Sequence, residues 1–147
     1  MIDASGTGTT AVLKASKTFP VGVLLSQFAD DGDSLAFEEM EIAATAVGMN
    51  GDLIAWDKAT NIPVSINLIP SSENDIDMGF VFEANRTGKG KKSVKDVISM
   101  TINYSNGSSV TLSNGKMVKG NPADTAQAAG RLSSKKYSFV FESMIKS

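Results

Sequence analysis

Hydrophobic and polar residues alternate with a period of two along much of the chain. The clearest such row is formed by Ile62, Val64, Ile66 and Leu68. Successive side chains of a strand point to opposite faces, so the alternation predicts strands with one buried face. The same argument predicts strands over residues 19–25, 35–44, 53–56, 62–69, 97–104, 110–112, 116–118 and 137–141.

Three Asn-Gly pairs predict tight turns, because both residue types accept positive φ angles. They are Asn50-Gly51, Asn106-Gly107 and Asn114-Gly115. The last two lie close together, which predicts a meander of short antiparallel strands with a turn at each pair.

Residues 72–86 are expected to form the one substantial helix. Ser72 and Asp75 have the spacing of a capping box, and Ile76 and Phe80 fall on one helical face. The apolar residues from 76 to 84 also alternate as a strand would. The acidic start of the segment and Arg86 near its end suit the helix dipole and favour the helix.

These elements predict a mainly β fold: an antiparallel sandwich or open barrel with one α-helix. The 147 residues suit one domain over 12–147, preceded by a flexible N-terminal arm over 1–11. Its expected core comprises Val64, Ile66, Leu68, Ile76, Phe80 and Phe139.

The composition offers little for catalysis. The chain has no cysteine and no histidine, which excludes thiol catalysis, histidine triads and most zinc sites. The lysine- and glycine-rich run 88–93 lacks the spacing of a phosphate loop, and Asp30, Asp31 and Asp33 lack that of a calcium loop. We therefore expect no catalytic, cofactor or metal site, and no enzymatic activity.

Charge is unevenly distributed, although the net charge is only −2. Acidic residues gather at Asp30, Asp31, Asp33, Glu38, Glu39 and Glu41, and basic ones at Lys89, Lys91, Lys92 and Lys95. In a single subunit each group is expected to be a solvated surface. If the subunit were repeated in a polymer, the same charges would produce a strong electrostatic field. No apolar run reaches the length of a membrane span, and the N-terminus has no signal-peptide pattern, so cytoplasmic synthesis is expected.

Three segments resemble the tail tube proteins of contractile-tailed bacteriophages, together with R-type pyocin and type VI secretion tubes. The first is the amphipathic strand that leads through Ser72-Glu73-Asn74-Asp75 into the helix. The second is residues 112–123, with its Gly-Asn-Pro-Ala end. The third is Gly130-Arg131-Leu132 leading to the strand at Tyr137-Ser138-Phe139. The resemblance covers most of residues 18–142.

The resemblance implies a structural virion protein whose sheets join edge to edge into a hexameric ring-shaped barrel. Rings would stack into the inner tail tube, which meets the baseplate, the tail terminator and the contractile sheath. DNA would pass through the lumen into the host without specific binding. The expected location is the virion tail, assembled in the host bacterial cytoplasm.

Within that framework, polar residues of predicted strands are candidates for the lumen: Ser65, Asn67, Thr101 and Asn103. The channel is expected to be neutral or negative, because a basic lumen would retain DNA phosphates. Candidates for contacts between subunits or with the sheath are Asp30, Asp31, Asp33, Glu38, Glu39, Lys89, Lys91 and Lys92.

Three other functions fit parts of the sequence. A tube initiator or terminator would form single rings with the same fold. A ligand-binding β-sandwich would gather aromatic side chains on one exposed face. A hydrolase would need a carboxylate pair whose separation the sequence does not give.

Overall fold

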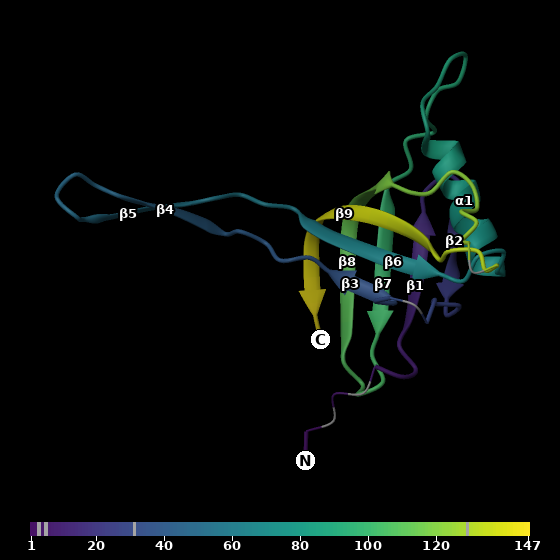
Figure 1. Ribbon diagram of the computed structural model, residues 1–147, viewed down its shortest axis with the longest axis horizontal. Coiled ribbons are helices and arrows are strands. Elements are labelled where there is room, and N and C mark those ends of the chain that lie inside the picture. The colour runs from purple at the N-terminus through teal and green to yellow at the C-terminus, as the bar shows by residue number, and fades with distance from the viewer. Residues whose placement is uncertain (3, 5, 31, 129) are drawn as a thin grey trace.

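The chain folds around one antiparallel sheet that curls into a half-barrel (Figure 1). The computed structural model describes residues 1–147 except 3, 5, 31 and 129. Its elements are β1 (Thr10–Ala15), β2 (Phe19–Leu25), β3 (Leu35–Phe37), β4 (Ala43–Val47), β5 (Leu53–Asp57), β6 (Ile62–Leu68), α1 (Glu73–Asn85), β7 (Ile98–Asn103), β8 (Ser109–Lys119) and β9 (Lys135–Lys146). Seven strands pair in the order β2-β1-β7-β8-β9-β6-β3, while β4 and β5 pair only with each other.

The mainly β, open-barrel prediction with one helix is confirmed. Within the described residues the main sheet is single, so a sandwich of two facing sheets does not form. The strand at 35–44 was predicted as one segment but is two, β3 and β4, which belong to different sheets. β1 was not predicted; it begins at Thr10, inside the range expected for the arm.

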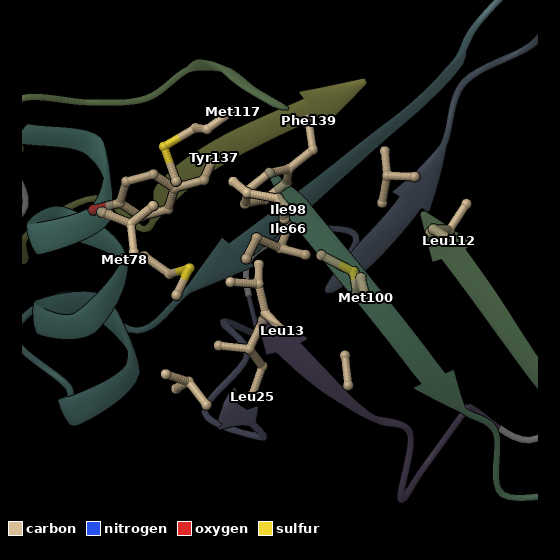
Figure 2. Close-up of a cluster of buried hydrophobic side chains, with 14 of the residues drawn as sticks. Leu13, Leu25, Ile66, Met78, Ile98, Met100, Leu112, Met117, Tyr137 and Phe139 are labelled. Carbon is tan, nitrogen blue, oxygen red and sulfur yellow. The ribbon is translucent and has the colours of Figure 1, made fainter. Parts of the chain in front are cut away.

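Alternating apolar residues on the inner face of the sheet form a single core. Val64, Ile66, Leu68 and Phe139 are buried, as their spacing predicts. Figure 2 shows the core side chains of several strands gathered beside Met78 of α1. Burying one large aliphatic or aromatic side chain contributes about 1.5–3 kcal/mol, so this cluster provides most of the stability of the half-barrel.

The helix is confirmed, but it presents a different face to the sheet from the one predicted. Met78 and Val81 are fully buried, whereas Ile76 and Phe80 remain 65% and 58% exposed. The prediction that Ile76 and Phe80 belong to the core is therefore wrong. The spacing of apolar residues does not show which of two apolar faces of a helix is buried, the face of Ile76 and Phe80 or that of Met78 and Val81. In α1, hydrogen bonds of anchoring polar side chains determine which face lies against the sheet.

Those anchors lie at the first turn of α1. The Ser72 hydroxyl caps the helix by accepting from the Asp75 backbone N–H at 3.2 Å. Asn74 is buried; its side chain accepts from the backbone N–H groups of Ser26 and Gln27, at 2.9 and 3.0 Å, and donates to the Leu24 carbonyl at 2.8 Å. These bonds fix the helix start to the end of β2.

Asp75, the next residue of the helix, provides a second anchor and bonds to a different strand. It accepts from the Tyr137 hydroxyl at 3.0 Å and lies 3.4 Å from the Lys135 ammonium. Tyr137 is fully buried, and its pKa is raised by burial and then by the charge of Asp75. The neutral hydroxyl therefore persists as a hydrogen-bond donor linking β9 to α1.

The turn predicted at Asn114-Gly115 is wrong, because β8 runs without a break from Ser109 to Lys119. Gly115 lies opposite Phe141, and a Cβ at this position would stand 2.2 Å from the phenyl ring. The absence of a side chain at Gly115 thus allows the Phe141 ring of β9 to pack directly on β8. The Asn50-Gly51 and Asn106-Gly107 turns do form, with positive φ at both glycines.

Candidate assembly surfaces

The sheet has two outer strands, β2 and β3, each paired on one side only in the described part of the chain. β3 is three residues long, whereas β2 has seven. An unpaired strand edge presents backbone N–H and C=O groups that can pair with another chain. β2 is therefore the longer available edge for such pairing.

The β4–β5 hairpin projects far from the half-barrel (Figure 1). None of its residues belongs to the core cluster. Cross-strand register places Ala44 beside Trp56 and Ala46 beside Ile54 on one face, called the hairpin face below. Ile54 and Trp56 are each 51% exposed, so this face is apolar and the described part of the chain does not cover it.

A second apolar surface lies over α1 and β2. It comprises Ile76 and Phe80 of the helix with Phe19 and Val21 of the strand, and is called the helix-edge patch below. The Phe19 and Phe80 rings meet edge to face, with centroids 5.8 Å apart. Val21 is 89% exposed. Exposed apolar patches of this kind mark interaction surfaces.

The four lumen candidates lie on the sheet face opposite the core, but they differ in exposure. Asn103 is exposed and Thr101 half-buried, whereas Ser65 is only 5% exposed. Asn67 is half-buried and its amide donates to the Asp33 carbonyl at 2.8 Å. Ser65 thus has too little free surface to line a channel, and Asn67 secures the turn before β3. Thr101 and Asn103 remain the candidates.

The same outer face carries lysines. Strand register places Lys14 beside Ser99, Lys116 beside Val140 and Lys136 beside Asn67. All three lysines are exposed. A neutral or negative channel was expected, and these three lysines would add positive charge to the channel if this face lined it.

The acidic candidates separate into two groups in space. Asp30 and Asp33 lie between β2 and β3, and Asp31 lies outside the described residues. Asp30 accepts from the Arg131 guanidinium at 2.7 Å, and this bond lowers the pKa of Asp30. Glu38 and Glu39 are exposed in the segment that leads to the hairpin.

The basic candidates lie in the loop after α1. Lys89 and Lys92 are exposed, while Lys91 forms an ion pair with Glu83 at 3.0 Å and also donates to the Glu83 carbonyl. Arg86 donates to the same carboxylate at 2.7 Å. Hydrogen bonds from Arg86 and then Lys91 lower the Glu83 pKa to about 2. The loop is thereby fixed to the end of the helix.

Asp96 connects this loop to the β1–β2 turn. Its carboxylate accepts from the Lys17 and Thr18 backbone N–H groups at 2.7 and 3.2 Å, and from the Asn85 amide at 2.8 Å. Burial acts to raise the pKa of Asp96, but the hydrogen bonds from Asn85, Lys17 and Thr18 outweigh it and the pKa is lowered. A buried, fully bonded carboxylate of this kind serves structure.

The described residues contain no group of three or more acidic side chains placed to bind a metal ion. No helix in the described part of the chain is long and apolar enough to cross a membrane. The exposed aromatic residues of the described chain are Phe37, Trp56 and Phe80. They lie on three different elements, β3, β5 and α1, and β5 and α1 are at opposite ends of the molecule, so the three do not form one platform (Figure 1).

Solved structures that share this fold include two from contractile systems. The chain superposes on a chain of the sheath-tube complex of an extracellular contractile injection system (PVC, extended state) with a TM-score of 0.56, at 6% identity, covering 99% of this chain and 93% of that one. It superposes on the tube terminating cap of the anti-feeding prophage with a TM-score of 0.53, at 8% identity, covering 100% and 93%. The chain therefore shares its fold with subunits of contractile systems, in agreement with the fold that the sequence resemblance implied.

A family model described as tail fiber protein gp32 matches residues 2–145. The chain belongs to this family. None of the curated proteins matches the sequence.

Sequence reasoning missed both apolar surfaces. Ile76 and Phe80 were identified as apolar but were expected to lie in the core. One signal was present: the strand opposite Leu53-Ile54-Ala55-Trp56 is Ala43-Ala44-Thr45-Ala46-Val47, whose small side chains cannot cover Trp56.

Proposed function

We propose that the chain is a structural tail protein that forms hexameric rings, which stack into the inner tube of a contractile phage tail. The observation that carries this proposal is the long edge of β2, unpaired in the described part of the chain, in a sheet whose fold is shared with a chain of a sheath-tube complex and with a tube terminating cap. Identical neighbours satisfy such an edge by continuing the sheet around a symmetry axis. In this role the protein has no catalytic activity, and its partners are the sheath, the baseplate and the terminator.

A single terminating ring is the second candidate function, and the fold shared with a tube terminating cap favours it. The family description, tail fiber protein, favours a third assembly, a slender fibre without a channel. The tube, the single ring and the fibre differ in shape, so electron microscopy can distinguish them. The ligand-binding module is less well supported, because the exposed aromatic residues do not gather on one face.

The passage of DNA is a separate part of the proposal. If the outer sheet face lines the channel, Lys14, Lys116 and Lys136 repeat around each ring and attract phosphates. For DNA to slide freely, either a different face of the sheet must line the channel, or carboxylates of neighbouring subunits must neutralise these lysines. Binding of short duplex DNA to assembled tubes, measured at low and high salt, tests this part by itself.

Electron microscopy of the purified protein tests the assembly. Long hollow tubes support the tube function, isolated rings support the terminator, and solid filaments support the fibre. A chain that remains monomeric at high concentration contradicts all three. Charge reversal at Lys91 and Lys92 then tests the basic loop, and unchanged tube formation and sheath binding would exclude it from these contacts.

A further inference from the structure

The three Asn-Gly pairs of the chain can undergo the same spontaneous reaction, deamidation, but the fold protects them unequally. They are Asn50-Gly51, Asn106-Gly107 and Asn114-Gly115. In such a pair the glycine backbone nitrogen attacks the side-chain amide carbon of the asparagine, because glycine has no side chain to obstruct the approach. The reaction needs a mobile backbone and an asparagine side chain that is free to turn toward the glycine.

The Asn114-Gly115 pair is held inside the main sheet. It lies in β8, which pairs with β7 on one side and with β9 on the other. Gly115 is buried against Phe141, whose ring would stand 2.2 Å from a Cβ at the glycine. Attack by the Gly115 nitrogen would require the sheet to open on both sides, so this pair is the best protected of the three.

The Asn106-Gly107 pair is exposed but firmly bonded. Asn106 Oδ1 accepts from the Ser108 backbone N–H at 3.0 Å and from the Ser108 hydroxyl at 2.6 Å. The Gly107 N–H donates to the Tyr104 carbonyl at 3.1 Å, and the Tyr104 N–H donates to the Ser108 carbonyl at 2.9 Å. The strands on either side, β7 and β8, contribute to the core, so this turn opens rarely.

The Asn50-Gly51 pair lacks both kinds of protection. It lies at the tip of the β4–β5 hairpin, far from the half-barrel (Figure 1). The Asn50 side chain is exposed and forms no hydrogen bond with any described residue, and the Gly51 N–H has one bond, to the Gly48 carbonyl at 2.9 Å. A two-stranded hairpin without a core is marginally stable, so this turn opens often and frees the Gly51 nitrogen.

We propose that Asn50 is a site of spontaneous deamidation that alters the hairpin tip of the unassembled subunit. The Gly51 nitrogen bonds to Asn50 Cγ, the bond from Cγ to the amide nitrogen breaks, and the Gly51 backbone proton leaves with the ammonia. One water molecule then opens the cyclic imide. Addition of water at Cγ gives aspartate with an ordinary backbone, whereas addition at the α-carbonyl gives isoaspartate, whose main chain runs through Cβ and Cγ.

The two products have different effects on the hairpin. Both add a negative charge at the tip, close to Asp52. Isoaspartate also adds a carbon atom to the main chain of a tight turn, in which the Gly48 N–H donates to the Asp52 carbonyl at 2.8 Å. Because turn geometry sets the register of a hairpin, the neighbouring Val47–Leu53 pair is disturbed. Isoaspartate therefore loosens the hairpin, while aspartate changes its charge.

Incubation of the full-length chain at mildly alkaline pH, below the concentration at which it assembles, tests the site. Peptide mapping by mass spectrometry, with fragmentation that distinguishes isoaspartate from aspartate, quantifies conversion at all three pairs of the same molecule. Asn50 should convert ~10-fold or more faster than Asn106 and Asn114, because a marginal hairpin opens at a much lower cost in free energy than the main sheet. In urea, where the fold is lost, the three rates should converge.

The outcomes are independent of the proposed function. If Asn50 converts no faster than Asn106 in the folded chain, the proposal is overturned whether or not tubes form. Conversion at Asn50 that is fast only in urea overturns it as well. A chain that deamidates at Asn50 but never assembles contradicts the proposed function and leaves the deamidation site standing.

Two variants separate the effect of the charge from that of the altered backbone. Asn50→Gln should stop conversion at the tip, because the longer side chain closes its ring far more slowly. Amide hydrogen exchange across residues 43–57 should be faster in incubated wild type than in fresh wild type, and unchanged by incubation in Asn50→Gln. Fresh Asn50→Asp carries the charge without the added main-chain carbon and should exchange as fresh wild type does. Exchange as fast in fresh Asn50→Asp as in incubated wild type would contradict the role of isoaspartate.

Discussion

The half-barrel and the β4–β5 hairpin are built from the same alternating pattern, yet only the half-barrel folds onto itself. In the half-barrel, the apolar rows of neighbouring strands meet α1 and bury one another. In the hairpin, each apolar side chain of β5 lies opposite alanine, threonine or valine, and no described hairpin residue belongs to the core cluster. Alternation thus specifies a strand, whereas burial depends on whether a second layer is present.

The largest expected contrast between the two regions concerns aromatic residues. Phe139→Ala should lower the free energy of unfolding by ~3–5 kcal/mol, because Phe139 is fully buried. Trp56→Ala should change it by less than ~0.5 kcal/mol, because Trp56 is half exposed on the hairpin. Urea denaturation below the assembly concentration measures both. Similar losses would show that the hairpin is part of the folded core.

Glycine substitutions sharpen the same contrast. Gly115→Ala should cost ~1–3 kcal/mol, because its Cβ would overlap the Phe141 ring and one strand must shift. Gly48→Ala, in the hairpin, is the control: its Cβ would make only ordinary contacts, the nearest at 3.5 Å. Thermal unfolding compares the two variants. An unchanged melting temperature for Gly115→Ala would mean that β8 and β9 are not packed this closely.

Acid should destabilise the half-barrel through Asp96. The pKa of Asp96 is lower in the folded chain than its ordinary value of 3.8. Its stabilisation is therefore complete above that value and is lost as the pH falls through the folded pKa. Asp96→Asn should cost ~1–3 kcal/mol at neutral pH and reduce the loss at low pH. Asp57→Asn in the hairpin is the control, and equal pH profiles for wild type and Asp96→Asn would contradict the role of Asp96.

The smallest effect is expected at Glu83, on the surface of α1. The Glu83 carboxylate has a pKa of about 2 in the folded chain, against an ordinary value of 4.5. It therefore stays charged, and keeps its contacts with Arg86 and Lys91, as the pH falls below 4.5; the contacts are lost only when the pH approaches about 2. Glu83→Gln should speed amide hydrogen exchange in residues 87–92 without changing global stability measurably. Glu39→Gln, near the hairpin base, should leave that loop unchanged. Slow exchange in both variants would show that the loop is ordered by other contacts.

The sequence predicted local elements well and their spatial partners poorly. The rows at Ile62–Leu68 and Ile98–Asn103 identify strands because each has one consistently apolar face. The inward face of α1 depends instead on Asn74 and Asp75, whose partners lie on β2 and β9, far away in sequence. Gly115 looked like a turn residue because its true constraint, the Phe141 ring, comes from another strand.

The assembly surfaces were harder to predict for a related reason. An apolar residue that is buried by its own chain and one that is left for a neighbour look alike in sequence. Ile76 and Met78 differ by two positions, and only the fold distinguishes them. The acidic and basic groups were recognised as contact candidates, but the separation of Asp30 and Asp33 from Glu38 and Glu39 required the structure.

The bonds of Asn74 have a mechanical consequence. Because one amide side chain bonds the backbone of residues 24, 26 and 27, the helix and the end of the outer strand behave as a single stiff unit. A neighbour that pulls on α1 also pulls on β2, without peeling one from the other. A force applied along a stack of such subunits would therefore load the three hydrogen bonds of Asn74 at the same time. Bonds that share a force resist rupture better than bonds that are broken one after another.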